Sequence, residues 1–305
     1  MEGILPLWKP KGMTSHDCVF KLRKILKTKK VGHTGTLDPD VTGVLPICIG
    51  RATKIAEYIT EAGKAYEGEV TIGYSTTTED ASGEKVEEKK ISSPIKREHI
   101  LQVLSSLTGE IEQTPPMYSA VKVNGKKLYE YARAGLIIER PSRKVTIHEL
   151  VLLDDRQEFA GETISFRFRV SCSKGTYIRT LAVMIGEMLG IPAHMSDLSR
   201  IESAGFTRDD CKTLEEVEEL MAAGHQEELF LPLERGLLHL PKYHINDKVA
   251  KKVENGAVME QPADLPVVKG IPFVMVDARQ KALAIYQIHP NKENLIKPVK
   301  VLIQG

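Results

Sequence analysis

The segment from Gly32 to Pro46 reads GHTGTLDPDVTGVLP and places an aspartate among glycines and prolines. Pro39 restricts the residue before it to an extended backbone, so the carboxylate of Asp38 projects from a stiff loop and not from a helix. Basic side chains and a histidine precede it, at Lys29, Lys30 and His33. Such a carboxylate can act as a nucleophile or a general base. Spacing by itself favours the plainer interpretation, in which Asp38 only begins a turn.

A second group of polar residues follows the clearest predicted strand, residues 163–172. Apolar and polar side chains alternate strictly there, with Ile164, Phe166, Phe168 and Val170 on one side and Ser165, Arg167, Arg169 and Ser171 on the other. Lys174 and Gly175 predict a turn, and a helix is expected from about Tyr177 to Leu189. A guanidinium from Arg179 beside Asp38 would lower the pKa of that carboxylate and orient it. The alternative is an arginine on a helix surface with an unrelated partner, and the preceding strand and turn favour the active-site placement.

The remaining elements predict an α+β fold. Thr14 and Ser15 can cap a helix over residues 15–26, residues 65–74 alternate as a strand, and residues 95–107 and 214–223 have helical spacing. Residues 32–50 are expected to form a long structured loop. Because strands and helices mix without a βαβ rhythm, we expect a mainly antiparallel mixed sheet with flanking helices.

The residue pattern of the sequence changes after residue 240. Short β-like runs at 273–276, 283–288 and 299–303 are separated by proline, glycine and asparagine. We therefore expect a large domain over residues 1–240 and a small β-rich module over residues 241–305.

Charge is balanced overall but segregated along the chain of 305 residues, which has 42 Lys+Arg against 41 Asp+Glu. Residues 18–37 contain no acid, and residues 122–144 are also strongly basic, whereas acids gather at Glu215, Glu216, Glu218 and Glu219. This pattern favours a basic face for a polyanion, although solvated helix faces would explain either run alone.

The cysteines and the N-terminus indicate a cytoplasmic protein. Cys18, Cys48, Cys172 and Cys211 are widely spaced and without a CxxC pair, which argues against a zinc site or a disulfide framework. No signal peptide and no membrane-length apolar run are evident.

Five motifs, in order, resemble those of the TruB-type bacterial tRNA pseudouridine-55 synthases. Gly32–Pro46 matches the GHTG(A/T)LDP…TG(V/M)LP signature, and WKPKGMTS at 8–15 resembles KPxGxTS. KAY at 64–66 resembles the strand that carries an active-site tyrosine. PPMYSAVKVNGKKLYE at 115–130 resembles PPxYSAxKxxGxxxYE, and CSKGTYIRTL at 172–181 resembles the SKGTYIR motif. The resemblance spans residues 8 to about 200, and the C-terminal module is similar in texture to an RNA-binding PUA-type domain.

The resemblance implies an isomerase that needs no cofactor and no metal. It converts the T-loop uridine at position 55 of tRNA to pseudouridine, with the base flipped out of the RNA. Asp38 is then the catalytic carboxylate, by attack on C1′, abstraction of a C2′ proton or addition to C6, and the residues leave these routes open.

The resemblance also implies roles for other residues. Tyr66, Tyr177 and Arg179 join the active site, Leu198 covers the detached uracil, and His33 enters the space vacated in the T-loop. Lys9, Gly35 and Lys64 are expected to bind substrate. An RNA-binding insertion over about 112–145 would contact the T-arm phosphates through Lys122, Lys126, Lys127 and Arg133.

Other interpretations of the same residues remain. A guide-RNA-dependent synthase of the Cbf5/dyskerin kind shares the GH(S/T)GTLDP core, but Tyr118–Ala120 with the following Asn124–Lys127 favours the stand-alone form, a monomer without an obligate protein partner. An RNA-binding factor that folds tRNA, with catalysis secondary, is a third possibility. A glycosidase would need a second carboxylic acid near Asp38, and no motif suggests one.

Overall fold

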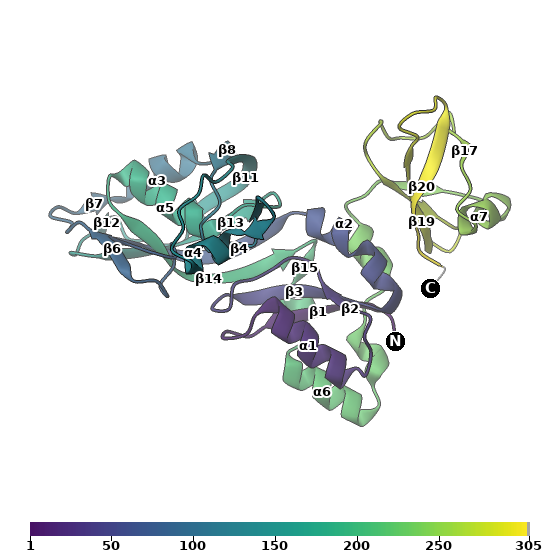
Figure 1. Ribbon diagram of the computed structural model, residues 1–305, viewed down its shortest axis with the longest axis horizontal. Coiled ribbons are helices and arrows are strands. Elements are labelled where there is room, and N and C mark those ends of the chain that lie inside the picture. The colour runs from purple at the N-terminus through teal and green to yellow at the C-terminus, as the bar shows by residue number, and fades with distance from the viewer. Residues whose placement is uncertain (304–305) are drawn as a thin grey trace. The chain divides into compact units, whose positions relative to one another are not determined.

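The computed structural model describes residues 1–303, which form two compact units (Figure 1). The first unit contains Met1–Pro39, Val44–Ala62 and the chain from Ser203 onward. The second unit contains Asp40–Gly43 and Gly63–Glu202. The predicted boundary near residue 240 stays a prediction.

The N-terminal part of the first unit is built on three strands and three helices. β1 (Gly3–Lys9) lies beside β3 (Thr42–Ile49), and β2 (Val31–His33) pairs antiparallel with β3. α1 (Ser15–Ile25) lies beside α6 (Leu214–Ala223), while the 3-10 turn η1 (Gly50–Ile55) leads into α2 (Ala56–Glu61). Short elements complete it: β15 (Phe206–Thr207), η2 (Arg208–Asp210), η3 (Gln226–Leu229) and η4 (Leu233–Leu237).

The C-terminal part of the first unit is a small β-rich module, as the sequence predicts. Its sheet has the order β16 (Lys242–His244), β18 (Phe273–Val276), β19 (Ala282–Ile288), β20 (Leu295–Val301) and β17 (Met259–Glu260), with helix α7 (Asp247–Glu254) beside it. β16 and β18 are parallel and the other pairs are antiparallel. Val274, Val276 and Ile285 share a buried cluster with Ile4 and Ile59, so the module has a common core with the N-terminal elements.

The second unit is built on a sheet with the order β14 (Ala193–Ser203), β4 (Lys64–Ile72), β13 (Ile164–Cys172), β11 (Arg143–Leu152) and β8 (Gly109–Gln113). Its helices are α3 (Arg97–Ser106), α4 (Leu128–Arg133) and α5 (Ile178–Leu189). Three short pairs complete it: β5 (Tyr74–Thr76) with β6 (Lys85–Glu88), β7 (Ile95–Lys96) with β12 (Glu158–Phe159), and β9 (Lys122–Val123) with β10 (Lys126–Lys127). The predicted α+β class with a mixed, mainly antiparallel sheet is confirmed.

Local patterns account for most of these elements. Thr14 caps α1 in a reciprocal capping box with Asp17, and Thr213 caps α6 in the same way with Glu216. β13 alternates between buried and more exposed residues along its length, as its sequence predicts. Gly190 ends α5 in the left-handed conformation that favours glycine.

The prediction of a long loop over residues 32–50 is wrong in part, because β3 occupies Thr42–Ile49. Every residue from Gly43 to Ile49 is buried, and a strand buried on both faces shows no alternation. Gly43 and Pro46 also work against the prediction of a strand, because glycine and proline are uncommon inside strands. Gly43 has φ +121°, and a Cβ there would lie 2.2 Å from the carbonyl oxygen of Arg200. The carbonyl of Pro46 accepts hydrogen bonds from the amide and the hydroxyl of Thr34.

No helix within residues 1–303 has the length and apolar character required to cross a membrane.

Candidate active site

The loop that carries Asp38 is clamped within the first unit by a buried lysine. Lys9 ends β1 and is fully buried, with Nζ donating to the carbonyls of Pro10 at 2.8 Å, Met13 at 2.5 Å and Pro39 at 3.1 Å. The amide of Gly12 also donates to the carbonyl of Pro39 at 2.9 Å. A buried ammonium requires such acceptors, so the KPxG turn and the residue after Asp38 are held together.

The other side of the same loop is tied to the start of α1. Ser15 is buried, and its Oγ accepts from the amide of Leu37 at 2.8 Å and donates to its carbonyl at 3.3 Å. Thr34 is fully buried at the other end of the loop, and Gly35 takes φ +116°, a conformation that favours glycine. Asp38 itself is half-buried. The loop therefore carries half-buried Asp38 on a backbone that is fixed on both sides.

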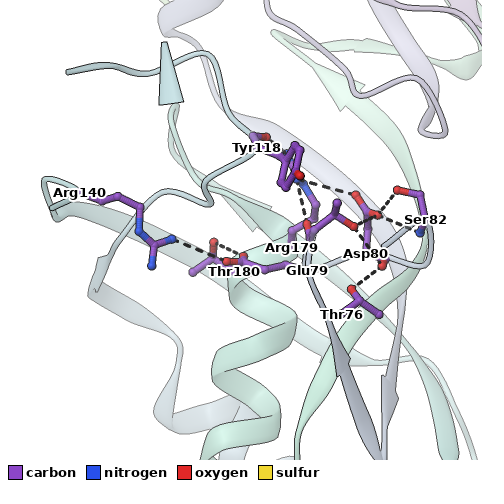
Figure 2. Close-up of polar contacts among 9 residues, drawn as sticks. Thr76, Glu79, Asp80, Ser82, Tyr118, Arg140, Arg179 and Thr180 are labelled. Atoms are coloured by element: carbon purple, nitrogen blue, oxygen red, sulfur yellow. Dashed lines mark hydrogen bonds and ion pairs between the residues drawn. The ribbon is translucent and has the colours of Figure 1, made fainter. Parts of the chain in front are cut away.

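Arg179 lies in the second unit, where it is 6% exposed at the start of α5 (Figure 2). Its guanidinium donates to the carbonyl of Thr78 at 3.1 Å and to the carbonyl of Tyr118 at 2.9 Å. One terminal nitrogen lies 3.8 Å from Oδ2 of Asp80. The arginine is thus held by the turn after β5 and by the Tyr118 segment, which the sequence analysis singled out as a motif.

Asp80 is itself held by a tight turn. Its Oδ1 accepts from the hydroxyl of Thr78 at 2.7 Å, the amide of Ser82 at 3.0 Å and the hydroxyl of Ser82 at 2.6 Å. The hydroxyl of Thr76 donates to the backbone carbonyl of Asp80 at 2.6 Å. These bonds leave Oδ2 directed at Arg179, as Figure 2 shows. A carboxylate fixed in this way orients the guanidinium.

Glu79 precedes it with φ +64°, a strained value for a residue with a side chain. Its carboxylate accepts from the hydroxyl of Thr180 at 2.9 Å and lies 4.0 Å from a nitrogen of Arg140. Burial raises the pKa of Glu79, while the Thr180 hydrogen bond and the charges of Arg179 and Arg140 oppose that rise. The same turn therefore contacts α5 and the end of the 112–145 segment.

Tyr177 occupies the N-cap position of α5 and is fixed through its backbone. Gln113 at the end of β8 is buried, accepts from the amide of Tyr177 at 2.9 Å and donates to its carbonyl at 3.2 Å. The guanidinium of Arg143 lies 4.8 Å from the centre of the tyrosine ring and donates to the carbonyl of Gly175. These contacts set the direction in which the ring of Tyr177 projects.

Tyr66 and Leu198 come from neighbouring strands of the second unit. Tyr66 on β4 and Leu198 on β14 are each 7% exposed, and Tyr66 is paired with Val170 of β13. A Cβ at Gly68 would lie 2.9 Å from the ring of Phe168 and 3.0 Å from a methyl of Leu198, so glycine leaves room for this leucine to pack closely against β4. Lys64, at the start of β4, is also buried.

The predicted RNA-contacting lysines lie on a hairpin and a short helix. Lys122 and Lys126 are exposed on β9 and β10, and Lys127 is half-buried before α4. Lys127 and the exposed Arg133 lie 5.4 Å and 5.3 Å from the centre of the Tyr129 ring. The cationic groups of Lys127 and Arg133 therefore both lie near the ring of Tyr129.

The predicted site residues divide between the two units. Lys9, His33, Gly35 and Asp38 belong to the first unit, and the others to the second. The pairing of Asp38 with Arg179 stays a prediction. Sequence reasoning missed Ser15, Glu79, Asp80 and Gln113 as supporting residues. Of these four, only Asp80 could have been predicted from the sequence, where it begins the run Asp-Ala-Ser-Gly. An aspartate two residues before a serine is typical of a turn that is closed by a side-chain hydrogen bond.

Three of the cysteines are unsuited to nucleophilic chemistry. Burial raises the pKa of the Cys48 thiol to about 12 and that of Cys172 to about 11, and it also raises the pKa of Cys18. The reactive thiolate is therefore not populated at neutral pH. Within residues 1–303 no group of three His, Cys, Asp or Glu side chains is arranged to hold a metal ion.

Two family profiles match adjoining parts of the chain. The TruB family pseudouridylate synthase (N terminal domain) profile covers residues 23–178, and the tRNA pseudouridylate synthase B C-terminal domain profile covers residues 179–238. A protein named tRNA pseudouridine synthase B from Geobacillus thermodenitrificans is 61% identical over 301 residues, which are 99% of each chain. One of the same name from Bacillus cereus is 59% identical over 306 residues, covering 100% of this chain and 98% of the relative.

Solved structures of the same architecture include a Cbf5–Nop10–Gar1 complex. The matching chain gives a TM-score of 0.75 at 28% identity, covering 99% of this chain and 84% of that one. A chain of an archaeal box H/ACA Nop10–Cbf5 complex gives a TM-score of 0.74 at 25% identity, over 99% of this chain and 86% of that one.

Proposed function

Because the chain belongs to the TruB family of pseudouridylate synthases, we propose that it converts the T-loop uridine of tRNA, position 55, to pseudouridine with Asp38 as the catalytic carboxylate. The observation that carries the proposal is the loop of Asp38, on which a half-buried carboxylate is held between buried Lys9 and buried Ser15. A catalytic group must be held in its productive geometry, and a clamped loop meets that requirement.

The reaction balances without a redox partner or a second substrate. The N1–C1′ bond breaks, the uracil turns within the site, a C5–C1′ bond forms, the hydrogen of C5 leaves to solvent, and N1 ends protonated. Asp38 acts in its ionised form, whether it attacks C1′, removes a C2′ proton or adds to C6.

Arg179 is proposed to pair with the ionised Asp38 when RNA is bound. Its guanidinium has five N–H donors. Hydrogen bonds from its two terminal nitrogens to the carbonyls of Thr78 and Tyr118 hold the guanidinium in place. Oδ2 of Asp80 lies 3.8 Å from one of these nitrogens and helps to orient the guanidinium. A planar fork held in this way would stabilise and aim a carboxylate better than a point charge.

The target base has to leave the folded T-loop before it can react. Tyr66 is proposed to stack on the flipped uracil, and stacking on an aromatic ring contributes about 1–3 kcal/mol per base. Leu198, packed beside β4 through Gly68, would cover the detached base. Tyr177 would lie beside the reacting ring, and His33 would fill the space that the base leaves.

The enzyme is proposed to act on tRNA without a guide RNA and as a monomer. Support comes from the 61% identity over 99% of each chain to a protein named tRNA pseudouridine synthase B. The Cbf5 chain, solved as part of a complex with partner proteins, is only 28% identical. Lys122, Lys126, Lys127 and Arg133 would then contact T-arm phosphates, together with Lys9, Gly35 and Lys64 on the substrate side.

Tritium release from tRNA transcript labelled at C5 of uridine tests the proposal. The wild type should release one tritium per tRNA, and replacing the T-loop uridine should abolish release. Asp38→Asn should reduce the rate below detection while tRNA affinity stays within a few-fold. Asp40→Asn is a matched control, because this exposed carboxylate lies two residues further along the same loop.

The outcomes separate the alternatives. Turnover by Asp38→Asn at an appreciable rate would contradict the assignment of the carboxylate. Tight binding of bare tRNA without any release by the wild type would favour a guide-dependent enzyme or a non-catalytic RNA-binding factor.

A further inference from the structure

α1 presents an exposed aromatic side chain in the middle of a basic surface. Phe20 is 55% exposed, and Nζ of Lys24 lies 4.4 Å from the centre of its ring. His16 and Lys24 are also exposed, each four residues from Phe20, and this spacing places the three side chains along one side of the helix. Lys27 is exposed two residues after the end of α1, where its backbone has φ +50°. We call His16, Phe20, Lys24 and Lys27 the α1 face.

Packing requirements do not explain this face. Lys21 lies on another side of the helix, where its ammonium is 3.4 Å from Glu218 of α6. Basic residues in the last turn of a helix complement its dipole, which accounts for Arg23 and Lys24. The dipole does not account for a phenylalanine left more than half exposed, since burying its ring would be favourable.

The charge of the α1 face is uncompensated by nearby acids on its own helix. Asp17 is the acid of α1, and its carboxylate accepts from the amide of Thr14 at 2.9 Å and from its hydroxyl at 2.6 Å. These hydrogen bonds lower the pKa of Asp17 and hold its charge at the helix N-terminus. Lys29 and Lys30 extend the basic surface beyond the helix, and both are exposed.

The α1 face also has a fixed relation to the proposed catalytic loop. The first residue of α1, Ser15, makes both hydrogen bonds to Leu37, the residue before Asp38. RNA held on α1 would therefore be positioned relative to Asp38 within a single unit.

We propose that the α1 face is a second RNA-binding surface for the tRNA substrate, on which Phe20 packs against a base or ribose and Lys24 contacts a phosphate. An aromatic ring among basic side chains suits RNA, since the ring stacks on any base while the ammonium groups neutralise the backbone. The inference rests on the proposed function for the identity of the RNA.

The test measures affinity for unmodified tRNA transcript at several salt concentrations. Phe20→Ala should weaken binding by about 5- to 20-fold, the lower range for loss of one stacking contact, without changing the salt dependence. Lys24→Gln should reduce the slope of log K against log salt by about 0.7–0.9, the value of one phosphate contact. Lys21→Gln, which removes a charge from the side of α1 facing α6, should change neither quantity.

Far-UV circular dichroism and thermal unfolding verify that each variant is folded, which the exposure of these side chains leads us to expect. Wild-type affinity and salt slope in both Phe20→Ala and Lys24→Gln would overturn the proposal. So would loss of self-association in Phe20→Ala with RNA affinity intact, since the face would then bind a second copy of the chain. Tritium release by the wild type, measured on the same tRNA, separates failure of this inference from failure of the proposed function.

Discussion

Asp80→Asn removes one negative charge from the group that holds Arg179 and changes little else. The amide is nearly isosteric with the carboxylate. An amide oxygen in place of Oδ1 keeps the hydrogen bonds from the Thr78 hydroxyl and from Ser82. An NH₂ group in place of Oδ2 then faces the guanidinium of Arg179 from 3.8 Å, and two donors oppose each other.

The magnitude follows from burial and distance. The side chains of Arg179 and Asp80 are 6% and 20% exposed, so water screens the pair only weakly. Breaking one partner of a buried charge pair costs about 2–5 kcal/mol. Because Arg179 keeps two carbonyl acceptors, we expect a transition-state loss of about 2–4 kcal/mol, or a rate about 30- to 900-fold slower.

The assay is single-turnover tritium release at saturating tRNA, with tRNA affinity measured separately. The rate should fall in Asp80→Asn while affinity stays within about threefold, since Asp80 acts through Arg179 and not on the RNA. Asp154→Asn is the matched control. Its carboxylate pairs with Arg156, whose guanidinium donates to the carbonyl of Ser165 near the start of β13, away from Arg179.

A rate within threefold of the wild type in Asp80→Asn would refute the reasoning, because Arg179 would then keep its catalytic position without the carboxylate. Equal slowing by Asp154→Asn would also refute it, since the effect would reflect general loss of stability.

Three further changes test other parts of the structure. Burial raises the pKa of Glu79 above its ordinary value of 4.5. The folded protein therefore keeps the Glu79 proton to a higher pH than the unfolded chain does. As a result, ionisation of Glu79 lowers the free energy of unfolding as pH rises above about 4.5. Glu79→Gln should remove this negative contribution, so that the slope of the free energy of unfolding against pH becomes more positive above about pH 4.5, as measured by urea unfolding. An unchanged slope would contradict the assignment. Gly43→Ala should destabilise the protein by more than about 3 kcal/mol, because the new Cβ would overlap the backbone of Arg200. Gly12→Ala is the control, since Gly12 also has a positive φ, +84°, but has open space around it, and it should cost about 1 kcal/mol. Similar costs in thermal unfolding would show that the close approach is unimportant. Lys9→Met should leave the part-buried carbonyls of Pro10 and Met13 without their ammonium donor, cost about 1–3 kcal/mol of stability and slow tritium release. A stable, fully active variant would remove the clamp from the mechanism.

Elements whose pattern is local were predictable from the sequence. Thr14 before an apolar helical stripe determines where α1 begins, and strict alternation identifies β13. These signals depend on residues two to four positions apart, so they survive without tertiary context. The residues proposed for the site were identified by the resemblance of motifs to those of a known family, and this was possible because each motif is continuous along the chain.

β3 was missed because its signal is not local. Its core run is buried throughout, so a strand and an irregular apolar segment look alike in the sequence. The need for glycine at Gly43 is set by the backbone of Arg200, which is distant along the chain.

The partners of the residues that support the proposed site were decided by tertiary structure. Asp80 and Arg179 lie far apart in the sequence, and no local pattern around either residue predicts that the two pair. Gln113 is an ordinary polar residue in the sequence, and Ser15 was expected only to cap a helix within its motif. Their contacts exist because β8 meets the start of α5 and α1 meets the Asp38 loop. The sequence by itself determined which residue types are available for the chemistry and on which local elements they lie. How those side chains are held depended on long-range packing, since a buried polar group takes whichever partner the fold brings within hydrogen-bond distance.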